Sequence, residues 1–131
     1  MADPGFYRRR CRQIAARQEF SIESPDDAQR TIRDLESIRS DLADLKSSLD
    51  DDLEQLHRHV RKKQRKYRPR IDRPEDRLMH NMRSVAFHSA TTFREWAYSY
   101  EARRIDGAIQ QCDEGIVRCQ AYLYRRMSES G

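Results

Sequence analysis

Apolar side chains recur every three or four residues through much of this chain, which is the spacing of one face of an α-helix. The most regular series follows Ser24 and Pro25, a pair that can cap a helix and form its first turn. Neither Gly nor Pro occurs from residue 26 to residue 68, so nothing forces an interruption. The pattern therefore predicts one long helix over 25–67. Its apolar face consists of Ala28, Ile32, Leu35, Ile38, Leu42, Leu45, Leu49, Leu53, Leu56 and Val60.

A break inside this long helix is the main alternative. Ser47 and Ser48 stand directly before three aspartates. Serine followed by acidic residues is typical of a helix N-terminus, so a new helix could begin within 47–52.

The rest of the chain predicts two further helices. Asp3-Pro4 can open a short helix over 4–20. Prolines near both ends of the next irregular segment disfavour helical backbone at the residues before them, so a turn is expected over 68–74. Apolar residues then return to helical spacing, which predicts a second long helix over 75–127.

The apolar face of this last helix changes phase part-way along. Its members lie at helical spacing up to Tyr100, and the next step is five residues, to Ile105. Such a step rotates the apolar face, so the helix either breaks near 103–107 or presents a second face to another partner. The first part carries Leu78, Met82, Val85, Phe93, Trp96 and Tyr100, and the second carries Ile105, Ile109, Cys112, Ile116, Cys119 and Leu123.

These elements predict an all-α fold in a single helical domain, residues 1–131. We expect an elongated antiparallel helical hairpin, or a three- to four-helix bundle, with coiled-coil-like packing. A leucine face this narrow buries little area within one hairpin. The chain is therefore expected to form a homo-oligomer, with a dimer favoured, or to bind a protein partner.

Composition agrees with a slender helical protein. Charged residues make up 37% of the 131 residues and the mean hydropathy is −1.06, so any core is narrow. Four Gly and four Pro are too few for a turn-rich β-sandwich or barrel. No apolar run approaches the roughly 18 residues of a membrane span, and the N-terminus lacks the apolar region of a secretory signal. We therefore expect no membrane partner and a cytoplasmic location, or a nuclear one in a eukaryote. Three cysteines do not make a disulfide framework, so we expect their thiols to be reduced.

Charge is distributed unevenly along the first long helix. Residues 34–54 contain eight acids and two bases, whereas residues 58–73 contain nine Lys or Arg and one acid. This order matches the helix dipole, which is one sufficient explanation. The other is an exposed basic face that binds phosphates without reading bases, since Tyr67 is the only aromatic residue in the run. The candidate polyanion-binding residues are Arg58, Arg61, Lys62, Arg65, Lys66, Arg68 and Arg70.

The densest aromatic region lies in the last helix. Alternate rings there point to different sides of a helix, so some of them should lie outside the apolar face. Exposed rings are typical of protein interfaces, although packing against the first helix would explain them equally plainly. The expected partner-interface residues are Phe93, Trp96, Tyr98 and Tyr100.

No motif indicates catalysis, a cofactor or a metal. Glu54 and His57 match half of a di-iron motif, but no second copy exists and Glu54 points away from the leucine face. Cys112 and Cys119 are too far apart along a helix to share a zinc ion without another segment, so buried thiols are expected. The leading hypothesis is a non-catalytic interaction or scaffold subunit. The alternative is a nucleic-acid-associated protein that contacts phosphates through the basic helix end.

Overall fold

The computed structural model describes residues 1–18, 20–66 and 74–129, and within these ranges it describes all side chains except those of 64–89. The described residues form an all-helical structure without a strand, so the predicted all-α class is confirmed. The turn expected over 68–74 lies outside the described residues, apart from Pro74.

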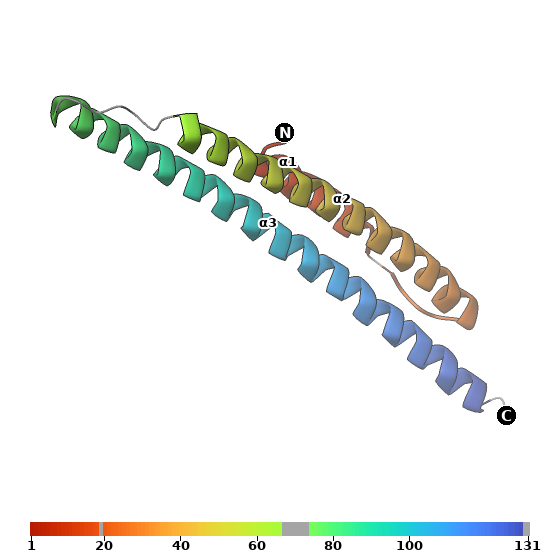
Figure 1. Cartoon of the computed structure of the whole chain (residues 1–131). Helices are drawn as coiled ribbons and strands as arrows, with labels where there is room; N and C mark the ends of the chain where they lie inside the picture. The colour runs from red at the N-terminus through yellow and green to blue at the C-terminus, as the bar shows by residue number, and fades with distance from the viewer. Residues whose placement is uncertain (19, 67–73, 130–131) are drawn as a thin grey trace.

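Three α-helices pack against one another (Figure 1). The helix α1 is Pro4–Ala15, followed by a short 3-10 helix, η1, at Ala16–Gln18; α2 is Pro25–Lys66 and α3 is Pro74–Glu129. The α-helix expected over 4–20 therefore ends early. Both long helices are continuous, so the alternatives of a break within 47–52 and near 103–107 are wrong.

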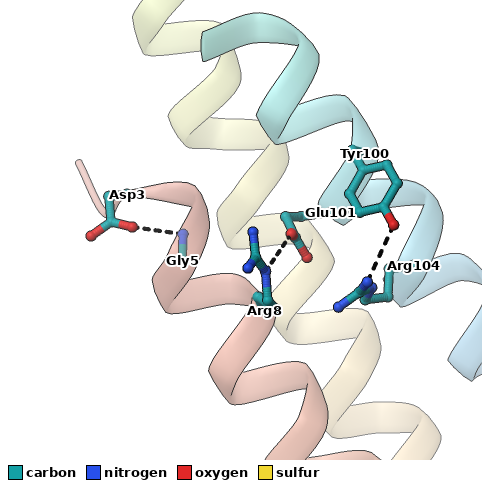
Figure 2. Close-up of polar contacts among 6 residues, drawn as sticks. All are labelled: Asp3, Gly5, Arg8, Tyr100, Glu101 and Arg104. Atoms are coloured by element: carbon teal, nitrogen blue, oxygen red, sulfur yellow. Dashed lines mark hydrogen bonds and ion pairs between the residues drawn. The ribbon is translucent and has the colours of Figure 1, made fainter. Parts of the chain in front are cut away.

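The first two helices begin where local sequence predicts. Asp3 Oδ1 accepts a hydrogen bond from the Gly5 amide at 2.6 Å, which Figure 2 shows, and Ser24 Oγ accepts one from the Asp27 amide at 3.2 Å. Each oxygen satisfies an amide that has no partner inside the first turn of its helix.

Helices α2 and α3 lie side by side and run in opposite directions (Figure 1). Two ion pairs and one histidine–glutamate contact between them show the register. From the first pair to the second, the α2 residue advances by seven and the α3 residue retreats by seven; from the second to the third, both steps are eleven. The pairs are Arg39–Asp113 at 2.6 Å, Lys46–Asp106 at 2.7 Å and His57–Glu95 at 3.3 Å.

The buried side of α2 is the predicted apolar face, with one difference at residues 31 and 32. Thr31 is buried, whereas Ile32 beside it is half-buried. Leu53 is also half-buried and packs against the core. The buried residues of α2 are Ala28, Thr31, Leu35, Ile38, Leu42, Leu45, Leu49 and Leu56.

From residue 90 onward, helix α3 turns one face inward without a change of phase. Continuing the face of Ile105 toward the N-terminus leads to Glu101, Tyr98 and Thr91, all of which are buried. The apolar face expected before Ile105 is therefore wrong in its described part, because polar residues occupy two of the inward positions. Among the side chains of α3 that are described, from residue 90 onward, the buried ones are Thr91, Tyr98, Glu101, Ile105, Ala108, Cys112 and Cys119.

Helix α1 packs against both long helices over part of their length (Figure 1). Its Tyr7, Cys11 and Ile14 are buried, as their helical spacing predicts. In Figure 1 the end of α2 and the start of α3 project well beyond α1, and the start of α3 extends farther than the end of α2. None of the described helices contains a stretch apolar and long enough to cross a membrane.

Candidate functional site

Three aromatic side chains form a row on the exposed side of α3. Phe93, Trp96 and Tyr100 have exposed fractions of 68%, 62% and 46%. The ring centroids of Phe93 and Trp96 lie 6.2 Å apart, and those of Trp96 and Tyr100 lie 5.8 Å apart with planes inclined by 27°. Steps of three and four residues bring the rings to one side of the helix. We call these three residues the aromatic row.

Arg104 extends the aromatic row by one turn. Its Nη2 atom donates a hydrogen bond to the Tyr100 hydroxyl at 3.3 Å, and its guanidinium lies 5.3 Å from the centroid of that ring (Figure 2). Figure 2 also shows that Glu101 points toward α1 while Tyr100 points to another side of α3. The aromatic row therefore does not pack under α1, and the alternative that the first helix covers all of these rings is wrong.

Tyr98 does not belong to this surface, although its position between exposed rings in the sequence suggested that it did. Its side chain is fully buried, and its hydroxyl donates a hydrogen bond to the Ala2 carbonyl at 2.5 Å. Its ring meets the edge of the Tyr7 ring at a centroid distance of 6.3 Å. Burial raises the pKa of Tyr98 above its usual value. The expectation that Tyr98 contributes to a partner interface is corrected: it holds the N-terminus against α3.

A second tyrosine anchors the start of α1 to α2. The Tyr7 hydroxyl donates to Asp52 Oδ2, and the same oxygen accepts a hydrogen bond from the Ala2 amide at 3.1 Å. Burial, together with the neighbouring Asp52 carboxylate, raises the pKa of Tyr7 well above its usual value. Asp52 thus binds two groups from a segment about fifty positions earlier, which spacing within α2 does not reveal.

A buried carboxylate joins α1 to α3. Glu101 has an exposed fraction of 1%, and its Oε1 atom accepts a hydrogen bond from Arg8 Nε at 3.1 Å (Figure 2). The Arg8 side chain is half exposed, and no described residue provides a partner for Glu101 Oε2. An ion pair with one open oxygen fixes the position of α1 more than it stabilises the fold.

Most acidic side chains described in α3 pair with the other helices, whereas several of its arginines do not. Four carboxylates pair with bases of α1 or α2, of which Asp106 and Asp113 stay half exposed, and Glu114 is exposed without an ion pair to another described residue. Several arginines of α3 remain exposed, and they form no ion pair with another described residue. The paired acids are Glu95, Glu101, Asp106 and Asp113, and the exposed arginines are Arg94, Arg103, Arg118 and Arg125.

Only the start of the predicted basic face lies within the described side chains. Arg58, Arg61 and Lys62 are exposed on α2. Arg58 Nη2 binds Glu54 Oε1 at 2.7 Å, whereas Arg61 and Lys62 form no ion pair with a described residue. The other four candidates lie outside the described side chains: Arg65, Lys66, Arg68 and Arg70.

Groups considered for metal or redox chemistry have structural surroundings. Glu54 and His57 bind different partners, Arg58 and Glu95. Cys11, Cys112 and Cys119 are buried free thiols, and burial raises the pKa of each. Within the described ranges, no three His, Cys, Asp or Glu side chains are grouped so that they could hold a metal ion.

Known proteins add no assignment. No family model, no curated protein and no solved structure matches this chain. The surfaces described above are therefore the basis on which a function can be proposed.

Two basic residues beside the aromatic row did not stand out in the sequence. Arg103 and Arg104 form only a pair, far shorter than the basic run of 58–73. They gain meaning because the acids near them in sequence, Glu95 and Glu101, turn toward α2 and α1. A helical projection combined with the expected ion pairs could have found them; a search for contiguous charge could not.

Proposed function

We propose that this protein is a non-catalytic helical interaction or scaffold subunit that assembles with itself, as a dimer, or with a protein partner. The observation that supports this function is the unequal width of the molecule. The N-terminal segment that begins with α1 reaches only as far as Asp52 and Tyr98, and α2 and α3 continue beyond it without α1 (Figure 1). A pair of helices covers only one side of each apolar face, which leaves the other side for a further helix.

The packing of α2 changes at this boundary. Leu42 and Leu49, on the stretch that α1 accompanies, are fully buried. Farther along α2, Leu56 is still buried, but Leu53 and Val60 on either side of it are only half-buried. A second hairpin, or a helix of a partner, would cover them and complete a four-helix core. Steps of three and four along α2, and equal steps of seven and eleven between its ion pairs with α3, support coiled-coil-like packing.

Sedimentation velocity of the full chain across the micromolar range tests self-assembly. We expect a dimer that Val60→Asp dissociates, because a carboxylate would be buried without a partner in the completed core. Ser40→Asp is the matched control, since it adds the same charge to an exposed position of the same helix and should leave the dimer intact. Circular dichroism verifies that both variants are folded. A wild-type chain that remains monomeric throughout this range contradicts assembly with itself.

A second candidate function is contact with nucleic-acid phosphates through the basic end of α2. It is supported by Arg61 and Lys62, which are exposed and have no ion-pair partner among the described residues. The neighbouring acids are already occupied, Glu54 by Arg58 and Glu95 by His57. The charge left on this surface is therefore positive, which suits a polyanion.

Salt dependence distinguishes the two functions. Phosphate contact releases counterions, so affinity for an oligonucleotide should fall steeply between about 50 and 200 mM salt. Reversing the charge of Arg61, Lys62, Arg65 and Lys66 should abolish it. An apolar protein interface should respond little to either change. An oligonucleotide affinity that the charge reversal leaves unaltered would contradict the second function.

A further inference from the structure

We propose that the aromatic row of α3 is a stacking platform for single-stranded nucleic acid, with bases on the three rings and phosphates bound by the arginines around them. This inference rests on the second of the two proposed functions, and it adds a base-contacting surface to one that contacts phosphates alone.

The rings are arranged as a platform. All three are exposed and lie in sequence along one side of α3 with about 6 Å between neighbouring centroids. Trp96 and Tyr100 are nearly parallel, and the guanidinium of Arg104 lies over the Tyr100 ring at the end of the row. Bases stack on aromatic rings and on guanidinium planes whatever their identity, because every base has a planar face.

The arginine side chains beside the rings indicate which class of ligand the surface would bind. Arg103 is exposed without an ion-pair partner among the described residues, Arg104 lies over the Tyr100 ring, and the acids nearest to the row pair with residues of α1 and α2. An apolar helix docked on the rings would desolvate these arginines without pairing them, which is costly. A polynucleotide supplies both planar bases and phosphate charges, so it satisfies the rings and the arginines together.

Helix α2 carries its basic residues at a comparable level along the hairpin. The His57–Glu95 pair, at 3.3 Å, places these two residues at the same level of the hairpin. Arg61 follows His57 by one helical turn, so it lies near the level of Thr91, just beyond the Phe93 end of the row. The rings lie on the side of α3 opposite its buried face, so Arg61 and Lys62 share a level with the end of the row but belong to the separate basic face of α2.

A single strand fits this surface better than a duplex. Bases within a duplex stack on one another and present only their edges in the grooves. The rings of the aromatic row offer faces, which unstacked bases can occupy. The platform is therefore expected to prefer a flexible single strand over a duplex of equal length.

Trp96 makes a direct test available, because it is the only tryptophan of the chain. The full chain is titrated with labelled single-stranded oligouridine of about twenty nucleotides, longer than the roughly 4–16 that one binding module usually covers. Anisotropy reports binding and Trp96 fluorescence reports stacking. The same titration is repeated with a duplex of equal length and with heparin, a polyanion without bases. We expect the single strand to bind and to quench Trp96, the duplex to bind more weakly, and heparin to bind without quenching.

A matched pair of variants tests the platform itself. Tyr100→Ala and Tyr124→Ala remove the same ring from exposed positions of the same helix, but only Tyr100 belongs to the row. Tyr100→Ala should weaken single-strand binding by about 5- to 150-fold, the range for losing one stacked base. Tyr124→Ala should have no effect, and Tyr100→Phe should retain affinity. Arg103→Gln should reduce the slope of log affinity against log salt by about 0.7 if it contacts one phosphate.

The outcomes separate this proposal from the function on which it rests. If oligouridine binds without quenching Trp96 and both tyrosine variants bind equally, stacking is wrong, while a loss of binding on charge reversal at Arg61 and Lys62 keeps phosphate contact. If no polyanion binds, both are wrong. If Trp96 instead changes with protein concentration alone, the row belongs to a self-association interface and the proposal is overturned.

Discussion

Two glycines in the interior of α3 provide a controlled test of how closely α2 and α3 approach. A Cβ atom at Gly107 would meet nothing within 4 Å, whereas one at Gly115 would lie 2.9 Å from Leu35 Cδ1 on α2. Both positions are helical, and the same substitution to alanine can be made at each. Any difference between the two variants therefore reports the packing around the new methyl group.

The expected magnitudes follow from two opposing effects. Alanine is more favourable than glycine inside a helix by about 0.8–1.0 kcal/mol, so Gly107→Ala should raise the free energy of unfolding by about that amount. The same gain applies at Gly115, but the Leu35 side chain is buried and must shift. Overpacking of this kind costs about 1–3 kcal/mol. Gly115→Ala should therefore be between roughly neutral and 2 kcal/mol destabilising.

Urea denaturation followed by far-UV circular dichroism measures both variants, at one protein concentration because self-assembly would alter the apparent stability. A Leu35→Ala background removes the atom that the new methyl group meets. In that background, Gly115→Ala should recover the stabilisation of about 0.8–1.0 kcal/mol. Gly115→Ala that stabilises the unaltered chain as much as Gly107→Ala does would refute the close approach of α2 and α3.

Three further predictions concern the attachment of α1 and the buried thiols. Tyr7→Phe should lower the free energy of unfolding by about 1–3 kcal/mol, since Asp52 loses a hydrogen bond in a partly buried site. Tyr98→Phe should cost less, because the acceptor of its hydroxyl is an uncharged carbonyl. Urea titration of both variants compares the two losses. Arg8→Ala should lower the free energy of unfolding by about 1–3 kcal/mol, because it leaves the buried Glu101 carboxylate without its cation. In a Glu101→Gln background the same substitution should cost much less, since no buried charge remains. A double-mutant cycle that shows no coupling between the two residues would contradict the ion pair. Burial raises the pKa of all three thiols, so the unfolded chain loses their protons first as the pH rises through the ordinary thiol value of 9.0, and the folded chain then retains more protons. The protonated thiols contribute fully to the free energy of unfolding below that pH, and this contribution is lost as the pH rises above it. The free energy of unfolding should therefore fall by up to about 1.4 kcal/mol per pH unit and per thiol. Replacing the three cysteines by alanine should flatten this decline.

The long helices were predictable because their signals are local. Uninterrupted leucine spacing predicted α2, and Asp3 and Ser24 predicted the caps of two helices. The serine and aspartate cluster within 47–52 suggested a break that does not occur, because Leu45, Leu49 and Leu56 continue the core face through it. Tertiary packing outweighs a cap signal of about 1 kcal/mol.

The face of α3 was not predictable from spacing alone. The rings of Phe93, Trp96 and Tyr100 have helical spacing and high hydrophobicity, so they resemble a core face. The inward positions of the same segment include Thr91 and Glu101, which are polar. Glu101 is buried because Arg8, from the other end of the chain, pairs with it. Contacts over such a separation in sequence leave no periodic signal.

The proposed stacking platform depends on the outward direction of the aromatic row, and the accessibility of Trp96 tests that direction most directly. Acrylamide quenching of Trp96 fluorescence is measured in the native chain, at a concentration where sedimentation shows a monomer, and again in urea. With 62% of its surface exposed, Trp96 should be quenched nearly as efficiently in the native chain as in the unfolded one. A native monomer whose Trp96 is protected from acrylamide and becomes accessible only on unfolding would contradict the outward direction of the row.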